Sequence, residues 1–369
     1  MNTPRSSRHW LPDFILLALL WGSSFLFLQK VSHAMGAIPT SWMRVSIAAL
    51  CLMPMVLVRQ QAGLLWQHRR QLLFVGLFNS GLPFSLFAYA LLSITTGLSS
   101  ILNTMAPLFG ALIAWLVYKE QLTRWRTLGM CLGFLGAMLL AMQAPGGVSF
   151  KPGGSGLAVV CCLLGGLSYG ISGNYTQRYL QHIPPMVLAT GSQMGASIAL
   201  LLPALWLWPG HAPDLPTWGA LFVSAALSTG LAYVLFFRLI AQLGSSGAMT
   251  VTYVAPVFAS VIGVVVLDEK ITGWMLGCAA IVLVGTALAT GTILNDDPPL
   301  SLSISGVSAA EGDSGTTIVT FTVTRTDGTA AFKVISRSCA CRYRAARSSG
   351  SCPSRCVGAR RRSARKRAS

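Results

Sequence analysis

The chain has 369 residues, of which 53% are hydrophobic and only 10% are charged. Soluble domains carry about 25% charged residues, so this chain cannot cover itself with a polar surface. Its net charge of +17 arises mostly at the C-terminus, because residues 301–369 hold 13 Lys and Arg against 3 Asp and Glu, whereas residues 1–300 hold 14 against 7. We therefore expect no nucleic-acid partner.

Ten apolar windows follow one another along residues 1–300. A helix needs about 20 apolar residues to cross a ~30 Å hydrocarbon core, and each window is close to that length. The linkers between them are too short to hold a soluble domain, so helices must carry any chemistry. The sequence predicts an all-α integral membrane protein with ten transmembrane helices. They cover approximately residues 12–30, 40–58, 72–92, 97–118, 125–142, 155–174, 185–208, 216–238, 246–267 and 273–293.

The chain also contains an internal repeat, at an offset of 148 or 149 residues. Trp21–Ser24 corresponds to Tyr169–Ser172, and the run Ala106–Trp125 corresponds to Ala255–Trp274 without a gap. A repeat of hydrophobic helices is typical of secondary transporters, whose halves rock around a shared site. We therefore expect a transporter that works by alternating access. The two predicted five-helix repeats are residues 1–148 and 149–294.

Basic residues lie mainly on one side of the predicted membrane. If the spans alternate in direction, ten Lys and Arg fall on one side and three on the other, and the positive-inside rule makes the richer side cytoplasmic. Both termini are then cytoplasmic, in a multi-pass protein of the plasma or bacterial inner membrane, and five spans per repeat make the repeats inverted. The ten are Arg5, Arg8, Arg59, Arg69, Arg70, Lys119, Arg124, Arg126, Arg178 and Arg238; the three are Lys30, Lys151 and Lys270.

Residues 295–369 have a different character. Leu300–Ile304 and Thr317–Thr324 alternate apolar with polar residues, which is typical of strands. The segment 295–332 resembles the start of a Calx-β motif over residues 300–332, but a complete β-sandwich needs about 100 residues. Residues 333–369 are basic and aperiodic. We expect this tail to be mostly disordered, because two strands without a core cannot offset the entropy of ordering them.

The origin of the tail has two interpretations. It is a cationic segment that binds anionic lipid or nucleic acid, or it is a fusion or frameshifted reading frame, which we favour. A membrane-anchored scaffold or receptor that uses the tail is the alternative function, and it requires the tail to fold.

No cofactor or metal is expected. Five of the nine cysteines, Cys51, Cys131, Cys161, Cys162 and Cys278, lie within apolar windows, where cysteine behaves as a small hydrophobic residue. The five His residues lie in tails and loops, away from any mid-span nucleophile. An enzyme is therefore not expected. The expected partners are a small-molecule solute and the lipid bilayer, and a homodimer stays open.

Arg44 is the only full charge well inside a predicted span. An arginine at mid-membrane costs about 2.5–3.5 kcal/mol on insertion scales, so it needs a reason to be there. It can pair with a substrate carboxylate, or it can extend along the helix to the interface, because it lies about one turn from the start of its span. The sequence leaves both interpretations open.

Other polar or aromatic residues recur at matched mid-span positions. Asn103 and Thr252 are repeat mates, and Pro107 and Pro256, each four residues later, should kink their helices and free a backbone carbonyl. Hydrogen bonding between helices without a ligand is the alternative. The predicted substrate cavity is lined by Trp21, Ser24, Arg44, Tyr89, Asn103, Pro107, Tyr169, Gln193, Tyr233, Thr252 and Pro256.

Four Gly-x-x-x-Gly pairs lie in or beside the apolar windows, and such pairs let helices approach closely. We therefore predict that they serve packing rather than binding. The pairs are Gly129/Gly133, Gly166/Gly170, Gly191/Gly195 and Gly273/Gly277.

Residues 12–293 resemble the drug/metabolite transporter superfamily, specifically an EamA-like permease. The resemblance rests on Trp21–Ser24, Arg44, the Ala-Pro pairs at Pro107 and Pro256, and the two Glu residues, 120 and 269, that end matching helices before Leu-Thr or Ile-Thr. It implies a ten-helix inverted-repeat carrier, usually an exporter of amino acids, other metabolites or drugs.

One feature departs from part of that superfamily. Its small multidrug members exchange protons through a glutamate in the middle of the first helix, whereas here the first span carries only Asp13, at its start. Glu120 and Glu269 lie at helix ends beside basic residues, where we expect ion pairs. Proton coupling through a buried carboxylate is therefore not expected, and a facilitator or a differently coupled antiporter stays open.

Ending the chain after Asp297 should leave membrane insertion and transport unchanged, because no predicted span or repeat motif lies beyond that residue. Transport assays of the truncated and full-length proteins at matched membrane levels check this. A truncated protein that reaches the membrane but does not transport would instead favour the scaffold or receptor.

Overall fold

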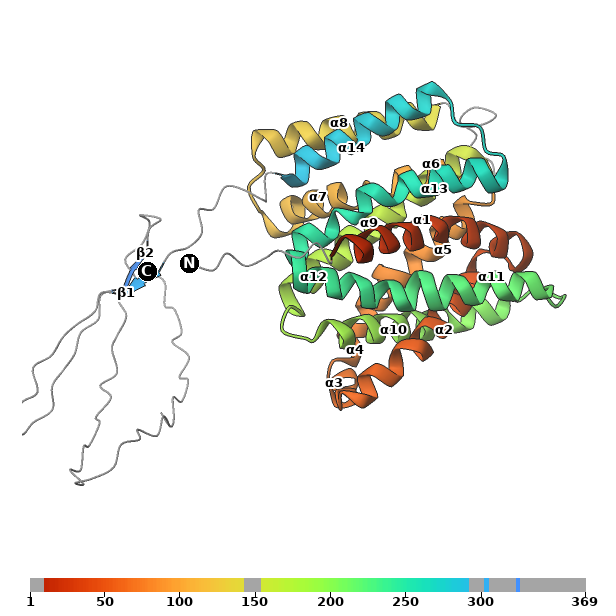
Figure 1. Ribbon diagram of the computed structural model, residues 1–369, viewed down its shortest axis with the longest axis horizontal. Helices are drawn as coiled ribbons and strands as arrows, with labels where there is room; N and C mark the ends of the chain where they lie inside the picture. The colour runs from red at the N-terminus through yellow and green to blue at the C-terminus, as the bar shows by residue number, and fades with distance from the viewer. Residues whose placement is uncertain (1–9, 143–153, 292–301, 305–322, 326–369) are drawn as a thin grey trace, which may run out of the picture. The chain divides into compact units, whose positions relative to one another are not determined.

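The computed structural model describes residues 10–142, 154–291, 302–304 and 323–325. The chain divides into two units, residues 1–296 and residues 297–369. The described part of the first unit is helical, which confirms the all-α class predicted for it (Figure 1).

The first repeat contains the helices of the first five predicted spans. A short helix, α3, precedes the third span, and a π-helical segment, η1, interrupts it. The elements are α1 (Trp10–Met35), α2 (Ala37–Val58), α3 (Ala62–Gln67), α4 (Arg69–Gly76), η1 (Leu77–Gly81), α5 (Leu82–Ala90), α6 (Thr96–Asn103), α7 (Ala106–Tyr118) and α8 (Arg124–Met142).

The second repeat follows the same order. Across the described residues, eight helical segments are long and apolar enough to cross a membrane, and two shorter apolar helices, α13 and α14, occupy the last two predicted positions. The elements are α9 (Ser155–Tyr179), α10 (Pro185–Trp206), α11 (Leu215–Ala225), η2 (Ala226–Leu231), α12 (Ala232–Met249), α13 (Val251–Leu267) and α14 (Gly273–Gly291).

Side-chain caps fix two helix starts. The first amides of a helix lack intrahelical partners, and a Thr or Asp side chain just before the helix can accept from one of them. Thr95 does so for α6, whose Leu98 amide donates to its hydroxyl, and Asp214 does so for α11 through the amide of Thr217. Hydrogen bonding from Thr217 also lowers the pKa of the Asp214 carboxyl.

The two π-helical segments lie at matching places in the repeats. Residues 77–81 shifted by 149 fall on residues 226–230, within η2. The apolar pattern predicts uninterrupted α-helices there. A π-helical turn adds one residue to a helix, and the pattern of apolar residues does not reveal such an insertion. π-Helical turns occur frequently at functional sites, and they leave backbone and side chains in positions that a regular α-helix does not offer.

The structure corrects one prediction about the prolines. Pro107 lies in the first turn of α7, after a break at Thr104 and Met105, rather than at a kink inside one helix. Proline is favoured in a first turn, because the amide that it lacks has no partner there in any case. Its mate Pro256 lies inside α13, so the two repeats differ at this point.

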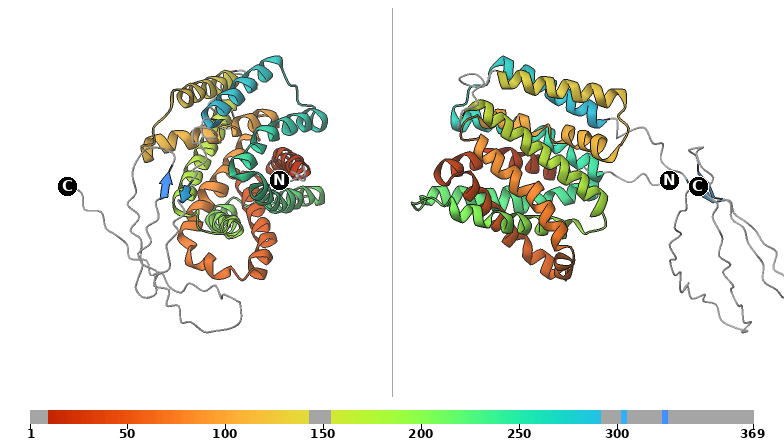
Figure 2. Two further views of the ribbon diagram at one scale, coloured as in Figure 1. Left: turned by 60° about the vertical axis from the view of Figure 1, so that its left-hand side comes forward. Right: turned by 180° about the vertical axis from the view of Figure 1, so that it is seen from behind.

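Helices from different repeats pack against each other throughout this unit. The main pairs are α2 with α10, α1 with α13, and α8 with α14. Figure 1 and both views of Figure 2 show α8 and α14 side by side at one edge of the helical unit. The α2–α10 pair is also joined by the Trp42 indole, which donates to the Ser197 carbonyl at 3.1 Å.

Glycines allow the closest helix approaches. In six of the eight predicted positions, an added Cβ would meet a neighbouring element at 3.0 Å or less, so the packing prediction is confirmed for Gly129/Gly133, Gly166/Gly170 and Gly191/Gly195. It is wrong for Gly273/Gly277, where a Cβ would meet nothing within 4 Å. On that helix, α14, Gly285 instead faces the backbone of Gly129 and Gly133 on α8.

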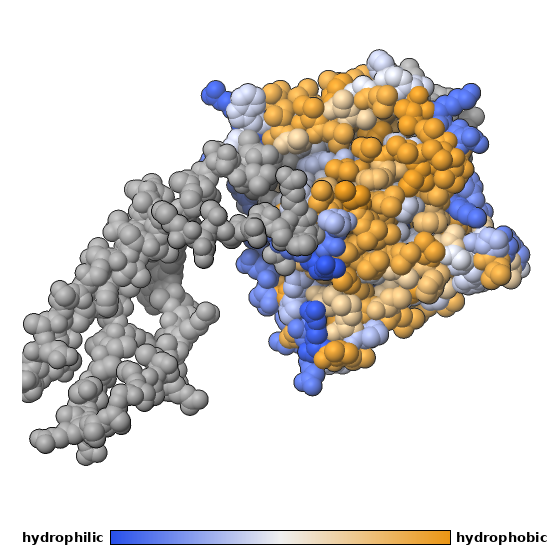
Figure 3. All heavy atoms as spheres, viewed as in Figure 1, coloured by the Kyte–Doolittle hydropathy of each residue, from blue (hydrophilic) through white to orange (hydrophobic). Residues whose placement is uncertain are grey.

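The helical unit has the surface of a membrane protein. In the view of Figure 3, hydrophobic side chains form a broad band, and hydrophilic ones gather toward the two ends of the helices. Large apolar side chains such as Leu202, Trp206 and Leu276 are exposed on it. A soluble monomer rarely exposes an apolar surface of this extent, so we assign the band to lipid contact.

Contacts near the ends of the candidate spans group these ends as alternating spans require. Arg238 pairs with Asp13 at 3.2 Å, and the rings of His68 and His182 lie 5.6 Å apart. These four residues all fall on the side that the basic residues mark as cytoplasmic.

In the second unit, the described residues form β1 (Leu302–Ile304) and β2 (Val323–Arg325). They pair antiparallel, with Leu302 opposite Arg325. Both strands overlap or adjoin the alternating segments that the sequence marks as strands. The rest of the Calx-β-like segment 295–332, and the segment 333–369 with its predicted disorder, lie outside the described residues.

Replacing Gly285 by Ala should destabilise the protein by about 1–3 kcal/mol, because the new methyl group would push α14 away from the α8 backbone. Gly277→Ala on the same helix is the matched control, since its methyl group would meet nothing. Denaturation in detergent measures both. Equal stability of the two variants would contradict the packing described here.

Candidate functional site

Arg44, on α2, is the centre of a buried polar group. Only 5% of its surface is exposed. Its Nε donates a 3.0 Å hydrogen bond to the hydroxyl of Thr229 on η2, and its guanidinium carbon lies 4.3 Å from the centroid of the Phe84 ring on α5. The side chain is therefore held between helices, and the interpretation in which it extends to the interface is wrong.

The charge of Arg44 has no counter-ion among the described residues, where the only ion pair joins Arg238 to Asp13. A guanidinium has five N–H donors, and Arg44 uses one of them, the Nε–H, in its hydrogen bond to Thr229. The face of Phe84 offers a cation–π contact, which contributes on the order of 2 kcal/mol when the cation is desolvated. These contacts lower the free-energy cost of burying the Arg44 guanidinium, but they do not neutralise its charge.

A second hydrogen bond mirrors the first. Gln193 on α10 is fully buried, and its Nε2 donates at 2.9 Å to the hydroxyl of Ser80 on η1. Gln193 is the repeat mate of Arg44 and Ser80 that of Thr229, both at an offset of 149. In each repeat, a polar side chain of the second span therefore donates a hydrogen bond to the π-helical segment of the other repeat.

The mirrored groups differ in charge and in their aromatic neighbours. At the position of Phe84, the second repeat has Tyr233, whose hydroxyl accepts from the Asn79 amide at 3.3 Å and lies beside Ser80 and Gln193. The Gln193 Oε1 atom is buried and accepts no hydrogen bond from the described residues. An unpaired buried acceptor is costly, and here it lies in the same group as an unpaired cation.

Aromatic rings surround the polar group. The phenols of Tyr169 and Tyr233 are within electrostatic range of Arg44, and Tyr169 stacks on Phe87 with ring centroids 6.3 Å apart. A chain of rings leads from Tyr233 through Phe237 and Phe236 to Trp21, each neighbouring pair 5.3–6.0 Å apart. Such a wall suits the apolar part of a solute.

The predicted site residues therefore divide into three sets. Arg44, Tyr169, Gln193 and Tyr233 belong to one group, and Trp21 is connected to Tyr233 through the rings of Phe236 and Phe237. Ser24 is buried, and its hydroxyl donates at 2.7 Å to the carbonyl of Trp21 in its own helix. Asn103, Pro107 and Pro256 are not among the contacts described above for the polar group, and the roles of these three residues and of Tyr89 and Thr252 stay predictions.

Sequence reasoning missed two features of this group, the partnership of Arg44 with Thr229 and the cation–π contact with Phe84. The repeat offset contains a signal for both. Shifting by 149 aligns Arg44 with Gln193, Ser80 with Thr229, and Phe84 with Tyr233, so the polar and aromatic positions of one repeat mark those of the other.

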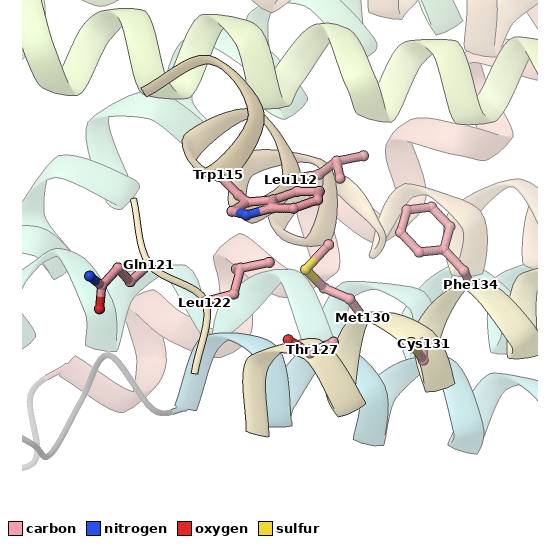
Figure 4. Close-up of a pocket in the computed structure, with 8 residues that line it drawn as sticks. All are labelled: Leu112, Trp115, Gln121, Leu122, Thr127, Met130, Cys131 and Phe134. Carbon is pink, nitrogen blue, oxygen red and sulfur yellow. The ribbon is translucent and has the colours of Figure 1, made fainter. Parts of the chain in front are cut away.

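Two surface grooves lie elsewhere. One, of about 760 Å³, lies between α7, the following linker and α8, and Figure 4 shows the Trp115, Leu112 and Met130 side chains around it. The other, of about 720 Å³, is bordered by Lys30, His33 and Glu269. None of the predicted site residues lines either groove. Among the residues described, no three His, Cys, Asp or Glu side chains gather as metal ligands would.

The fold and the buried polar group define a multi-pass membrane transporter built from two repeats. The chain belongs to the EamA-like transporter family, whose model matches residues 10–142 and 156–291, one match in each repeat. The match does not include residues 300–332, so the Calx-β resemblance gains no support.

Curated relatives agree with this class. An uncharacterized transporter, YoaV, from Bacillus subtilis (strain 168) is 22% identical over 72% of this chain and 93% of its own. Protein LicB from Haemophilus influenzae is 22% identical over 70% and 89%. In a crystal structure, a chain 18% identical aligns with a TM-score of 0.55 over 78% of this chain and 98% of its own, which shows a shared fold. The name of YoaV, like that of the family, describes a transporter, which is not a class of enzyme.

Proposed function

We propose that this protein is a secondary transporter that exports small metabolites, such as amino acids, or drugs by alternating access between two inverted repeats. The family and the membrane-spanning helices give the class. The observation that carries the proposal is Arg44, a cation buried between helices of both repeats with no carboxylate partner among the described residues.

The substrate site lies between the repeats, around Arg44 and its mate Gln193. Arg44 holds an anionic group of the solute, because a planar guanidinium can bind a carboxylate through two parallel hydrogen bonds. The unpaired Oε1 of Gln193 accepts a hydrogen bond from a donor on the same solute. A zwitterion such as an amino acid carries both groups, and the rings of Tyr169 and Trp21 face its apolar part.

The two π-helical segments support a site at this position. Each one receives a side chain from the opposite repeat, Arg44 at Thr229 and Gln193 at Ser80. Movement of one repeat against the other changes both contacts together. The contacts of a solute bound between them therefore depend on which end of the protein is open. Ser24, Tyr89, Asn103 and Thr252, with the helix breaks at Pro107 and Pro256, are proposed to line the pathway beyond this centre.

In the proposed topology ten helices cross the plasma or bacterial inner membrane, with both termini in the cytoplasm. The alternation of helix ends supports it. The guanidinium carbon of Arg178 lies 4.5 Å from the centroid of the Tyr118 ring, and both residues are assigned to the cytoplasmic side. The two repeats, residues 1–148 and 149–294, then run in opposite directions.

Arg44→Ala should reduce affinity for an anionic or zwitterionic solute about ten- to a hundredfold, because one charge-assisted contact contributes ~1.5–3 kcal/mol. Arg44→Lys should keep part of the affinity, since it preserves the charge but loses the planar fork. Growth rescue against toxic amino acids, their analogues and cationic drugs identifies a substrate, and competition assays then measure affinity.

Arg59→Ala is the matched control, because Arg59 follows the same helix but is exposed. It should transport as the wild type does. An Arg44→Ala protein that inserts normally and binds substrate with unchanged affinity would refute the proposed role of Arg44.

The topology has its own test. A single cysteine introduced between residues 143 and 153, in an otherwise cysteine-free chain, should react with a membrane-impermeant thiol reagent added outside the cell. One introduced at Gln67 should react only from the cytoplasmic side. Labelling of the 143–153 cysteine from the cytoplasm alone would rule out the ten-span arrangement.

A further inference from the structure

Glu269, just after α13, binds the start of α6 in the other repeat. Its Oε1 accepts a 2.7 Å hydrogen bond from the Thr96 amide, and its Oε2 accepts from the Thr96 hydroxyl at 3.0 Å and the Gly97 amide at 3.2 Å. The ion pair predicted for Glu269 is therefore wrong within the described residues. The free amides at a helix start attract a carboxylate by both hydrogen bonding and the helix dipole.

The surroundings of this contact are shaped to fit it. A Cβ on Gly263 would collide with both the Glu269 carboxylate and the Thr96 hydroxyl. A Cβ on Gly97 would lie 3.3 Å from the Ser260 hydroxyl. The close approach of α13 to the start of α6 therefore depends on Gly263, whereas a side chain at residue 97 would lie directly against residue 260.

Glu120 is the repeat mate of Glu269, and the turn before it has the same backbone conformation. The preceding residues, Lys119 and Asp268, are both left-handed, with φ of 60° and 53°. The amides of Glu120 and Glu269 each donate a 3.1 Å hydrogen bond to the carbonyl six residues earlier. Both glutamates therefore follow turns of the same backbone conformation.

The partners of the two carboxylates differ. Glu120 is exposed and forms no hydrogen bond or ion pair through its carboxylate with the residues described. The mates of Thr96 and Gly97 are residues 245 and 246. These lie inside α12, which runs unbroken to Met249, so their amides are committed to the helix. The first repeat has a helix start at this place and the second has a helix interior.

Helix packing shows the same difference. Where Glu269 binds, α13 packs against α6. The mates of these two elements are α7 and the C-terminal part of α12, and the described helices include no comparable packing between them. Among the described residues, the two repeats are thus joined at Glu269, and the corresponding contact at Glu120 is not made.

We infer that Glu269 is a gating residue, which closes one end of the transport pathway by binding the start of α6, and that Glu120 closes the other end in the alternate conformation by binding at residues 245–246. The inference rests on the alternating-access function proposed above. It assigns a role to the two acidic residues that lie outside the substrate site.

The sequence of the second repeat is suited to this exchange. Gly244 and Gly247 flank the two serines at 245 and 246. Glycine weakens a helix interior, because it loses more backbone freedom on folding than other residues. A break of α12 there would free two amides for Glu120, as the break before α6 frees two for Glu269. In the sequence, Ser245 is the repeat mate of Thr96.

The experiment uses the full chain without native cysteines and with Ser260→Cys as the reporter, since residue 260 lies in the α6–α13 contact. A membrane-impermeant maleimide is applied separately to whole cells and to inside-out vesicles, without substrate. Glu269→Gln should speed the labelling of this cysteine about tenfold, because the amide loses the charge-assisted hydrogen bonds that hold the closed end. Glu120→Gln should slow it.

Asp268→Asn is the matched control, since it removes the neighbouring exposed charge and should leave the rate unchanged. A cap that only stabilises the fold would not make Glu120→Gln act in the opposite direction. If Glu269→Gln inserts poorly, the pair Gly97→Cys and Ser260→Cys replaces it. That pair should form a disulfide on oxidation, and Glu120→Gln should speed the reaction.

Equal rates in Glu269→Gln and the parent chain, or shifts of the same sign in both Glu variants, would overturn the gate while leaving the transporter class intact. For the cysteine pair, a disulfide that fails to form or an unchanged rate in Glu120→Gln would overturn it equally. Shifts of opposite sign without transport of any solute would support the gate and count against the proposed substrates.

Discussion

A guanidinium inside a membrane protein must be solvated by the protein itself, and Arg44 places this requirement at the centre of the fold. Insertion of such a group costs about 2.5–3.5 kcal/mol even on permissive scales. Thr229 and Phe84 provide part of this solvation, through a hydrogen bond and a cation–π contact. Both belong to elements that converge on α2, so the packing of α5 and η2 around α2 and the polar character of the centre depend on the same residue.

Duplication gives the molecule a matched pair of most features, and the proposed function rests on the differences between the copies. The second span carries a cation, Arg44, in one repeat and an amide, Gln193, in the other. The two repeats share a backbone plan but therefore differ in chemistry at the proposed site. At the helix ends, turns of the same conformation precede Glu120 and Glu269, but among the described residues only Glu269 contacts a helix start. Two copies of one sequence pattern in different conformations are what a rocking transporter requires.

Much of this architecture follows from the sequence. Apolar length and the repeat offset predicted the all-α class and the places of the helices, because both are local properties of the chain. The break before Pro107, the π-helical segments and the role of Gly285 were not predicted, since they depend on which helix lies opposite. Arg44, Gln193 and Tyr233 were found as polar residues within spans, whereas their pairing with Thr229, Ser80 and Asn79 required the packed structure.

The central claim is that Arg44 is kept without a protein counter-ion because a solute supplies one. The most direct measurement compares the thermal stabilisation of the purified protein by carboxylated solutes with that by their primary amides, which match them in size but lack the charge. Stabilisation by an acid and not by its amide is the predicted result. Equal stabilisation by both members of every pair that binds would contradict the claim.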